Sequence, residues 1–217
     1  LLPSRITYFS YPNRTGGKFF ESNDIKCLGI QTSEEATRNL YTIIRRNGVR
    51  FALLNFTYGT NGISIPKSFP NMVHLFSEKE VRNALEQARS VADFVIVFVH
   101  WGTEYAQKPD AFQKMWTQIF LECEVDVVVG THPHCLQPYE LLVNDNGHQM
   151  LVYYSIGNYI SAQSEKSCVK GGVAQFTIGL TPDGYQLTEY MLQPLAITWH
   201  EGGKYTVECL IEKGNNE

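Results

Sequence analysis

The pattern of apolar positions predicts three buried strands along the middle of the chain. Apolar residues fill most of Val49 to Thr57, Phe94 to Val99 and Asp126 to Val129. Continuous apolar runs of this length are typical of strands that are covered on both faces, as in parallel sheets. The second run ends abruptly in His100-Trp101-Gly102, and the third ends in Gly130-Thr131-His132-Pro133-His134.

Segments with helical spacing separate these runs. Ser77 and Glu80 have the spacing of a capping box, and the apolar residues after them predict a helix that reaches about Val91. Another helix is predicted from about Asp110 to Glu122. Because helices alternate with buried strands, the sequence predicts βα units.

A further helix is predicted before the first buried strand. It opens at Ser33-Glu34-Glu35-Ala36 and carries Leu40, Ile43 and Ile44 on one face. The pair Asn47-Gly48 is a stop signal, so we expect this helix to end there.

The chain changes character after Gln137, where turn residues separate short apolar segments. Asp145-Asn146-Gly147, Pro182-Asp183-Gly184 and Glu201-Gly202-Gly203 are typical of hairpin turns. The whole chain is therefore predicted to be an α/β protein in which βα units pass into an antiparallel β meander. The predicted strands of the meander lie around 138–143, 149–154, 171–180, 186–199 and 204–211.

Composition narrows the choice of partners. The 217 residues are 43% hydrophobic and 18% charged, which is ordinary for a globular domain, and the formal net charge is −4. Without a basic stripe the chain is a poor nucleic-acid binder, so we expect no nucleic-acid partner. A small anionic substrate or an anionic polymer would need a local cation, which a metal ion can supply.

Neither the cysteines nor the apolar runs place the chain in a compartment. The five cysteines are scattered and odd in number, so they do not outline a disulfide scaffold. We expect no transmembrane segment, because no apolar run is long enough to span a bilayer, and no signal peptide at Leu1 to Ser10.

Histidines stand at the ends of two predicted strands. His100 follows the run at 94–99, and His132 and His134 follow the run at 126–129. In open α/β sheets ligands bind beyond the carboxyl ends of the strands, and neutral imidazoles are good ligands for zinc, manganese and iron. A single histidine at a strand end is more often a hydrogen-bonded structural residue, but the pair together with His100 favours a metal site.

Four stretches of the chain carry a more specific signal. Taken together and in this order, they resemble the CapA family of bacterial capsule synthesis proteins, also called poly-γ-glutamate biosynthesis proteins, of the calcineurin-like metallophosphoesterase superfamily. The resemblance covers about residues 25 to 180. The four stretches are Asn55-Phe56-Thr57-Tyr58-Gly59-Thr60-Asn61-Gly62, His100-Trp101-Gly102-Thr103-Glu104-Tyr105, Gly130-Thr131-His132-Pro133-His134-Cys135-Leu136-Gln137 and Tyr154-Ser155-Ile156-Gly157-Asn158-Tyr159.

The resemblance implies a layered α/β/β/α sandwich with a site for two divalent metal ions, such as Mn, Zn or Fe, at the sheet ends. By analogy with the superfamily, His100 and His132 would bind one metal and His134 the other. Two metals can orient a phosphoester and stabilise the charge that develops as it is hydrolysed. Glu104, Gln137, Glu140 and Asn158 fall in the family's motifs, where each could contact substrate or metal ligands, or could equally cap a loop.

The sequence departs from the superfamily at its start. Residues 1–23 are predicted to be an irregular lead-in and show neither the early aspartates nor the Asn-His pair, so residues 24–217 are interpreted as the C-terminal part of the domain. Three imidazoles alone can neither neutralise nor bridge two divalent cations. Either the upstream half lies outside this chain, or this copy is not catalytic.

Two hypotheses about function therefore stay open. The first is a metal-dependent phosphoesterase, a hydrolase that is complete in the full-length protein. The second is a non-catalytic component of the capsule or poly-γ-glutamate machinery that binds polymer, membrane enzymes or a second copy of itself. An uncovered sheet edge would favour self-association, and the resemblance implies an extracellular or cell-surface location.

Overall fold

The computed structural model describes residues 22–23, 27–30, 40–65, 67, 72–182 and 184–210. Its larger sheet consists of β1 (Tyr41–Arg46), β2 (Val49–Thr57), β3 (Phe94–His100), β4 (Val127–Thr131), β5 (Tyr139–Val143) and β6 (Gln149–Tyr153). The strands lie in the order β1-β2-β3-β4-β6-β5. The four central strands are parallel, whereas β1 and β5 pair antiparallel at the two edges. The carboxyl ends of β2, β3, β4 and β6 therefore meet at one edge.

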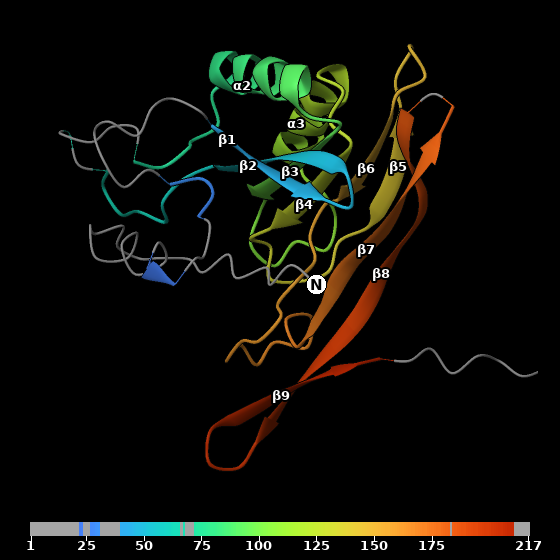
Figure 1. Cartoon of the computed structure of the whole chain (residues 1–217). Helices are drawn as coiled ribbons and strands as arrows, with labels where there is room; N and C mark the ends of the chain where they lie inside the picture. The colour runs from blue at the N-terminus through green and yellow to red at the C-terminus, as the bar shows by residue number, and fades with distance from the viewer. Residues whose placement is uncertain are drawn as a thin grey trace, which may run out of the picture.

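Two other layers cover the faces of this sheet (Figure 1). Helices α2 (Glu78–Val91) and α3 (Ala111–Glu122) lie on one face. The opposite face packs against a three-stranded antiparallel sheet of β7 (Lys170–Thr181), β8 (Gly184–His200) and β9 (Lys204–Cys209). This arrangement confirms the predicted α/β fold with an antiparallel meander. It accounts for three layers of the expected α/β/β/α sandwich, and the described ranges contain no outer helical layer beyond the meander.

The position of β3 between two packed layers explains why apolar and polar residues do not alternate along it. Val95, Val97 and Val99 pack into the cluster beneath the helices, whereas Phe94 and Ile96 pack toward the meander. Because successive side chains point to opposite faces of a sheet, a strand buried on both faces must be apolar at every position. The prediction of a doubly covered strand is confirmed.

The predicted helix over residues 33–46 is wrong where the structure describes it. Tyr41–Arg46 form strand β1, which pairs with β2, while residues 31–39 lie outside the described part of the chain. Asn47 and Gly48 have φ angles of 50° and 85°, as a two-residue hairpin turn requires. The neighbours Ile43 and Ile44 pack into the clusters on opposite faces of the sheet, which only a strand allows.

Both other predicted helices are confirmed, but their caps differ from expectation. Ser77 is the N-cap of α2, yet its side chain makes no cap hydrogen bond, so the expected capping box is wrong. The capping box belongs instead to α3. Its Asp110 Oδ1 accepts from the Gln113 backbone N–H at 2.9 Å, and Gln113 Oε1 accepts from the Asp110 N–H at 3.1 Å. This box fixes the start of α3 behind the loop that follows β3.

The five strands predicted after Gln137 are all present, with bounds shifted by at most a few residues. Residues 1–21 of the lead-in predicted at residues 1–23, and the chain beyond residue 210, lie outside the described residues, so the predicted division at residue 24 stays a prediction. None of the helices in the described ranges is long and apolar enough to cross a bilayer.

Candidate metal centre

The expected site lies where the parallel strands end. Thr57 of β2 is in register with His100 of β3, and His100 is in register with Thr131 of β4. The backbone continues this pairing beyond the strands, because the Tyr58 N–H donates to the His100 carbonyl at 3.0 Å. Tyr58, His100 and His132 therefore start from adjacent positions at one sheet edge.

The His100 and His132 rings lie side by side. Their centroids are 4.3 Å apart and the ring planes are inclined at 67°. Tyr58 packs over both, with ring centroids 5.6 Å from His100 and 4.7 Å from His132. His100 is buried and His132 is half-buried, whereas the Tyr58 side chain remains 43% exposed. The tyrosine thus separates the two imidazoles from solvent on one side.

Both imidazoles of this pair favour the neutral form. Burial, together with the neighbouring His132 and His134, lowers the pKa of His100 to about 3. Burial also lowers the pKa of His132, although the nearby Glu104 opposes the shift. A neutral imidazole keeps one nitrogen lone pair, which is what a metal ligand requires. The buried His132 Nδ1 has no hydrogen-bond partner within the described ranges.

The loop that carries His132 and His134 has an unusual backbone. The φ angles are 100° at His132 and 61° at His134, in the left-handed region that residues other than glycine rarely adopt. Such strain persists only where the surroundings enforce it, and it clusters at functional sites. Gly130 lets the loop start close to its neighbours, because a Cβ there would overlap the Tyr154 backbone oxygen and meet Trp101 Nε1 at 2.5 Å.

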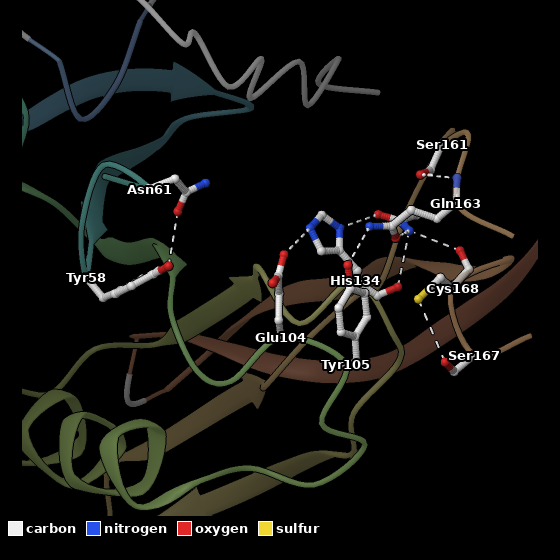
Figure 2. A network of polar contacts seen from close by, with 10 residues as sticks. Tyr58, Asn61, Glu104, Tyr105, His134, Ser161, Gln163, Ser167 and Cys168 are labelled. Atoms are coloured by element: carbon white, nitrogen blue, oxygen red, sulfur yellow. Dashed lines mark hydrogen bonds and ion pairs between the residues drawn. The ribbon is translucent and has the colours of Figure 1, made fainter. Parts of the chain in front are cut away.

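His134 is held by hydrogen bonds rather than by burial. Its ring centroid lies 6.2 Å from that of His132, so the structure brings the third predicted histidine to the same edge. Asn158 Oδ1 lies 3.0 Å from His134 Nδ1, and Glu104 Oε1 lies 3.6 Å from His134 Nε2. Figure 2 shows the His134 ring between Glu104 on one side and the Gln163 region on the other.

Two pairings place these neighbours. The bridge between Leu136 and Ile156 brings the loop around Asn158 beside the loop of His134. The Tyr105 N–H donates to the Pro133 carbonyl at 2.8 Å, which sets the segment with Glu104 against the same loop. Tyr105 also stacks on His134 with ring centroids 6.1 Å apart.

Gln137 and Glu140 make contacts other than with the histidines. Gln137 Nε2 donates to the carbonyls of Ala106 and Lys108 at 2.8 and 3.2 Å, and its Oε1 accepts from Gln113 at 2.7 Å. Glu140 accepts from the Tyr154 hydroxyl at 2.6 Å. Gln137 therefore supports the loop that carries Glu104, while Glu140 ties β5 to the end of β6.

The remaining histidines make ordinary contacts. His148 Nε2 lies 3.0 Å from the Val125 carbonyl, and His200 Nε2 lies 2.7 Å from Thr206 Oγ1. His74 is buried beside Phe56, with ring centroids 6.3 Å apart. None of these three was predicted to bind a metal.

The donor chemistry of the site fits a divalent cation only in part. His100 and His132 offer neutral nitrogens close together, and His134 and Glu104 offer a nitrogen and a carboxylate. Across the part of the chain that the structure describes, no group of three or more histidine, cysteine, aspartate or glutamate side chains has metal-binding geometry. The site therefore has imidazole donors but not a complete ligand set within these residues.

Sequence reasoning missed the aromatic side chains of the site. Tyr58 and Tyr105 stack on the histidines, and neither was proposed as a site residue. A signal for Tyr58 was present, because it follows a strand predicted to be buried and parallel to the strand of His100. The sequence therefore implies that Tyr58 lies at the same edge of the sheet as His100.

Comparison with known proteins identifies relatives. A family model described as "Bacterial capsule synthesis protein PGA_cap" matches residues 15–163. The capsule biosynthesis protein CapA of Bacillus anthracis is 30% identical over 151 residues, which are 67% of this chain and 35% of that protein. The PGA biosynthesis protein CapA of Bacillus subtilis (strain 168) is 32% identical over 151 residues, 69% of this chain and 38% of that protein. The chain spans little more than a third of the length of these two relatives.

A solved structure with some likeness is that of the NAD nucleotidase NadN from Haemophilus influenzae. The match covers 89% of this chain and 40% of that chain, with 16% sequence identity and a TM-score of 0.49. A likeness at that level does not bear on function. The family model, in contrast, matches well over half of the sequence, and the chain therefore belongs to the bacterial capsule synthesis protein PGA_cap family.

Proposed function

We propose that the chain forms the histidine-bearing part of a metal-dependent phosphoesterase-like domain that serves capsule or poly-γ-glutamate biosynthesis. The metal is proposed from one observation, the pair of neutral imidazoles of His100 and His132. Their ring centroids lie 4.3 Å apart at the ends of two parallel strands. The biosynthetic role is supported by family membership and by the names of the two Bacillus relatives.

The residues of the chain would act by holding and shielding the reacting group. Bound divalent cations, Mn, Zn or Fe, would polarise a phosphoryl group and offset its charge. His100 and His132 would hold one cation, and Tyr58 would keep water from one side of their rings. His134 would present its ring toward the same edge, where Asn158 fixes its orientation. An anionic phosphoester is the substrate that such a site favours.

Metal content and hydrolysis test this proposal together. The chain is loaded with Mn²⁺ or Zn²⁺, dialysed, and analysed for metal, and its hydrolysis of p-nitrophenyl phosphate and bis(p-nitrophenyl) phosphate is followed. We expect His132→Ala to lose both bound metal and turnover. The matched control is His200→Ala, because His200 is exposed at the far end of β8. Equal metal in wild type and His132→Ala would refute the proposal.

A second candidate function is binding without turnover in the same machinery. It is favoured by the incomplete ligand set within the described residues. In this case the chain would bind an anionic polymer such as poly-γ-glutamate, or membrane-associated capsule enzymes. Polymer retention by wild type and His132→Ala alike, with no hydrolysis by either, would favour this candidate over the phosphoesterase.

Self-association and location belong to the same proposal. In the described ranges no further strand pairs with the outer edges of β1 and β5, and Val143 on β5 is 56% exposed. Edges of this kind pair with other chains, so we expect a dimer or larger species. Light scattering after size-exclusion chromatography measures it, and a monomer at all concentrations would contradict it. We expect the protein at the cell surface, where protease accessibility on whole cells is the check.

A further inference from the structure

The two outer strands of the larger sheet differ in the side chains that they carry. Strand β1 ends in Arg45 and Arg46, which are both exposed. Charged side chains on an edge strand are one means by which proteins oppose pairing with another chain. Strand β5 carries a single charged residue, Glu140, whose carboxylate accepts from the Tyr154 hydroxyl of the same chain at 2.6 Å. Of the two edges, β5 is therefore the one that favours a partner strand.

The backbone groups of alternate β5 residues face away from the sheet. The Tyr154 N–H, just beyond the end of β6, donates to the Pro138 carbonyl at 3.2 Å, so position 138 faces β6. Successive residues of an edge strand direct their hydrogen-bonding groups alternately toward the sheet and away from it. Within the described residues no other strand pairs with the outer side of β5. The residues with outward N–H and C=O groups are therefore Tyr139, Leu141 and Val143.

The order of residues in β5 allows this strand to pair with a second copy of itself. In an antiparallel pair centred on Leu141, Tyr139 of one copy faces Val143 of the other. These pairs join residues with outward backbone groups, so both hydrogen bonds of each pair can form. Glu140 faces Leu142 of the other copy, which keeps the two carboxylates apart. A pair centred on Glu140 would instead place like charges directly opposite each other, which is unfavourable.

The side chains that meet in this register are those that a single copy leaves exposed. Tyr139 is 40% exposed and Val143 is 56% exposed. Both lie on the face of β5 that packs toward the meander, since Leu141 between them belongs to the cluster on that side. Tyr190 of β8 lies edge-on against Tyr139, with ring centroids 6.3 Å apart, and extends this apolar surface. Pairing would cover these side chains together with the open backbone groups.

We propose that two copies of the chain pair through β5 in this register and join their larger sheets into one sheet across a two-fold axis at Leu141. Such an interface is self-complementary, as the closed symmetry of a dimer requires. The assignment rests on the self-association proposed above, but not on the metal or on hydrolysis. A strand of 5 residues is too short to bury the roughly 800 Å² per partner of a standard interface. We therefore expect a dimer that dissociates in the micromolar range.

Hydrogen exchange of the unaltered chain tests which edge is used. Between a dilute and a concentrated sample, the amides of Tyr139, Leu141 and Val143 should become more protected, while the amides of β1 should exchange at the same rate. Light scattering of the same samples gives the fraction of dimer. Protection of β1 in place of β5 would overturn the assignment. A monomer in both samples would overturn it together with the proposed self-association.

Proline substitution supplies a matched pair of variants. Val143→Pro removes an outward N–H of β5 but no hydrogen bond to β6, so the monomer should keep its fold. Because the two-fold axis removes that hydrogen bond twice, dimerisation should weaken by at least about tenfold. Arg45→Pro is the control, because Arg46 pairs with Val49 across the two-residue turn and the Arg45 N–H therefore faces outward from β1. Equal dimerisation of wild type and Val143→Pro, or equal weakening by both variants, would contradict the assignment.

The outcomes also separate this inference from the proposed metal site. Val143 pairs with Gln149, at the end of the sheet opposite the carboxyl ends of the parallel strands. Val143→Pro should therefore keep the metal content of the unaltered chain, and His132→Ala should lose metal and still dimerise. If His132→Ala were a monomer, dimerisation would depend on the metal and the assignment to β5 would fall. If His132→Ala kept its metal and dimerised through β5, the metal proposal would fall and the assignment would stand.

Discussion

The histidine-bearing edge of the larger sheet and the β8–β9 end of the meander are built in opposite ways. At the edge, Trp101 is fully buried and its Nε1 donates to the Tyr154 carbonyl at 2.9 Å. The β8–β9 end projects away from the larger sheet, and Trp199 there is 60% exposed (Figure 1). The two tryptophans therefore differ in burial, since Trp101 packs inside the protein and Trp199 faces solvent. Close packing fixes the geometry of the edge, whereas we expect the exposed hairpin end to tolerate substitution.

The largest expected effect comes from adding one methyl group at the edge. In Gly130→Ala the new Cβ would overlap the backbone oxygen of Tyr154, which cannot move without breaking the end of β6. We expect a loss of about 3 kcal/mol in unfolding free energy, the upper end of the usual cost of overpacking, or no folded protein. Urea denaturation measures the difference.

The same change in the meander is the control. In Gly179→Ala the Cβ would meet Thr188 Cγ2 at 2.7 Å, but Thr188 is exposed and its side chain can rotate. We expect a change within about 1 kcal/mol. If both glycine variants lost equal stability, the contrast between the two regions would fail.

Acid should lower the unfolding free energy through buried histidines of the larger sheet, and not through the exposed β8–β9 end. Burial lowers the pKa of His74 to about 4, although a hydrogen bond with the Asn55 backbone opposes the shift. The folded state then binds fewer protons than the unfolded state, so stability is complete above about pH 6.5 and falls toward pH 4. The loss from this residue should be about 3 kcal/mol.

Variants of the two histidines sharpen the acid experiment. His74→Gln should make the fall in unfolding free energy between pH 6.5 and 4 less steep without abolishing it, because the buried His100, whose pKa is lowered to about 3, contributes over the same range. Denaturant titration at each pH measures the slope. His200→Gln should leave that slope unchanged, because His200 is exposed at the end of β8. An unchanged slope in His74→Gln would mean that this residue is not the one that resists protonation.

Gln137 should show a smaller effect. Gln137→Met keeps the volume but removes the hydrogen bonds to Ala106, Lys108 and Gln113. Because the buried Gln113 amide keeps only its longer hydrogen bond, to the Tyr154 carbonyl at 3.2 Å, we expect a loss of about 2 kcal/mol in unfolding free energy. Faster hydrogen exchange around residues 102–108 would show that the loop with Glu104 loosens, and unchanged exchange would contradict this role.

The smallest effect is expected at Trp199. Trp199→Ala removes a side chain that is mostly exposed, so the unfolding free energy should change by less than about 1 kcal/mol. Thermal unfolding is sufficient to measure it. A loss as large as that of Gly130→Ala would mean that another chain or segment covers this end of the hairpin.

The fold was predictable wherever burial decided it. The apolar runs at β2, β3 and β4 are readable because a strand covered on both faces leaves no polar position. Strand β1 was misread because Leu40, Ile43 and Ile44 match helical spacing by chance. Pairing with β2 across the Asn47-Gly48 turn decided the outcome, as tertiary contacts often override short periodic patterns.

The meeting of the candidate site residues was predictable only along the parallel strands. His100 and His132 meet because the carboxyl ends of adjacent parallel strands are in register, which the sequence pattern implies. The approach of Asn158 to His134 depends on the bridge between Leu136 and Ile156, which no local pattern reveals. Glu140 fell in a family motif yet contacts Tyr154, because position in a motif does not fix where a side chain points.

Anomalous diffraction from a crystal grown with Zn²⁺ tests the central claim most directly. We expect an anomalous peak at the zinc edge about 2.1 Å from ring nitrogens of His100 and His132. The same data from His132→Ala should lack it. Zinc bound elsewhere, with no peak between these two rings in the unaltered chain, would contradict the account.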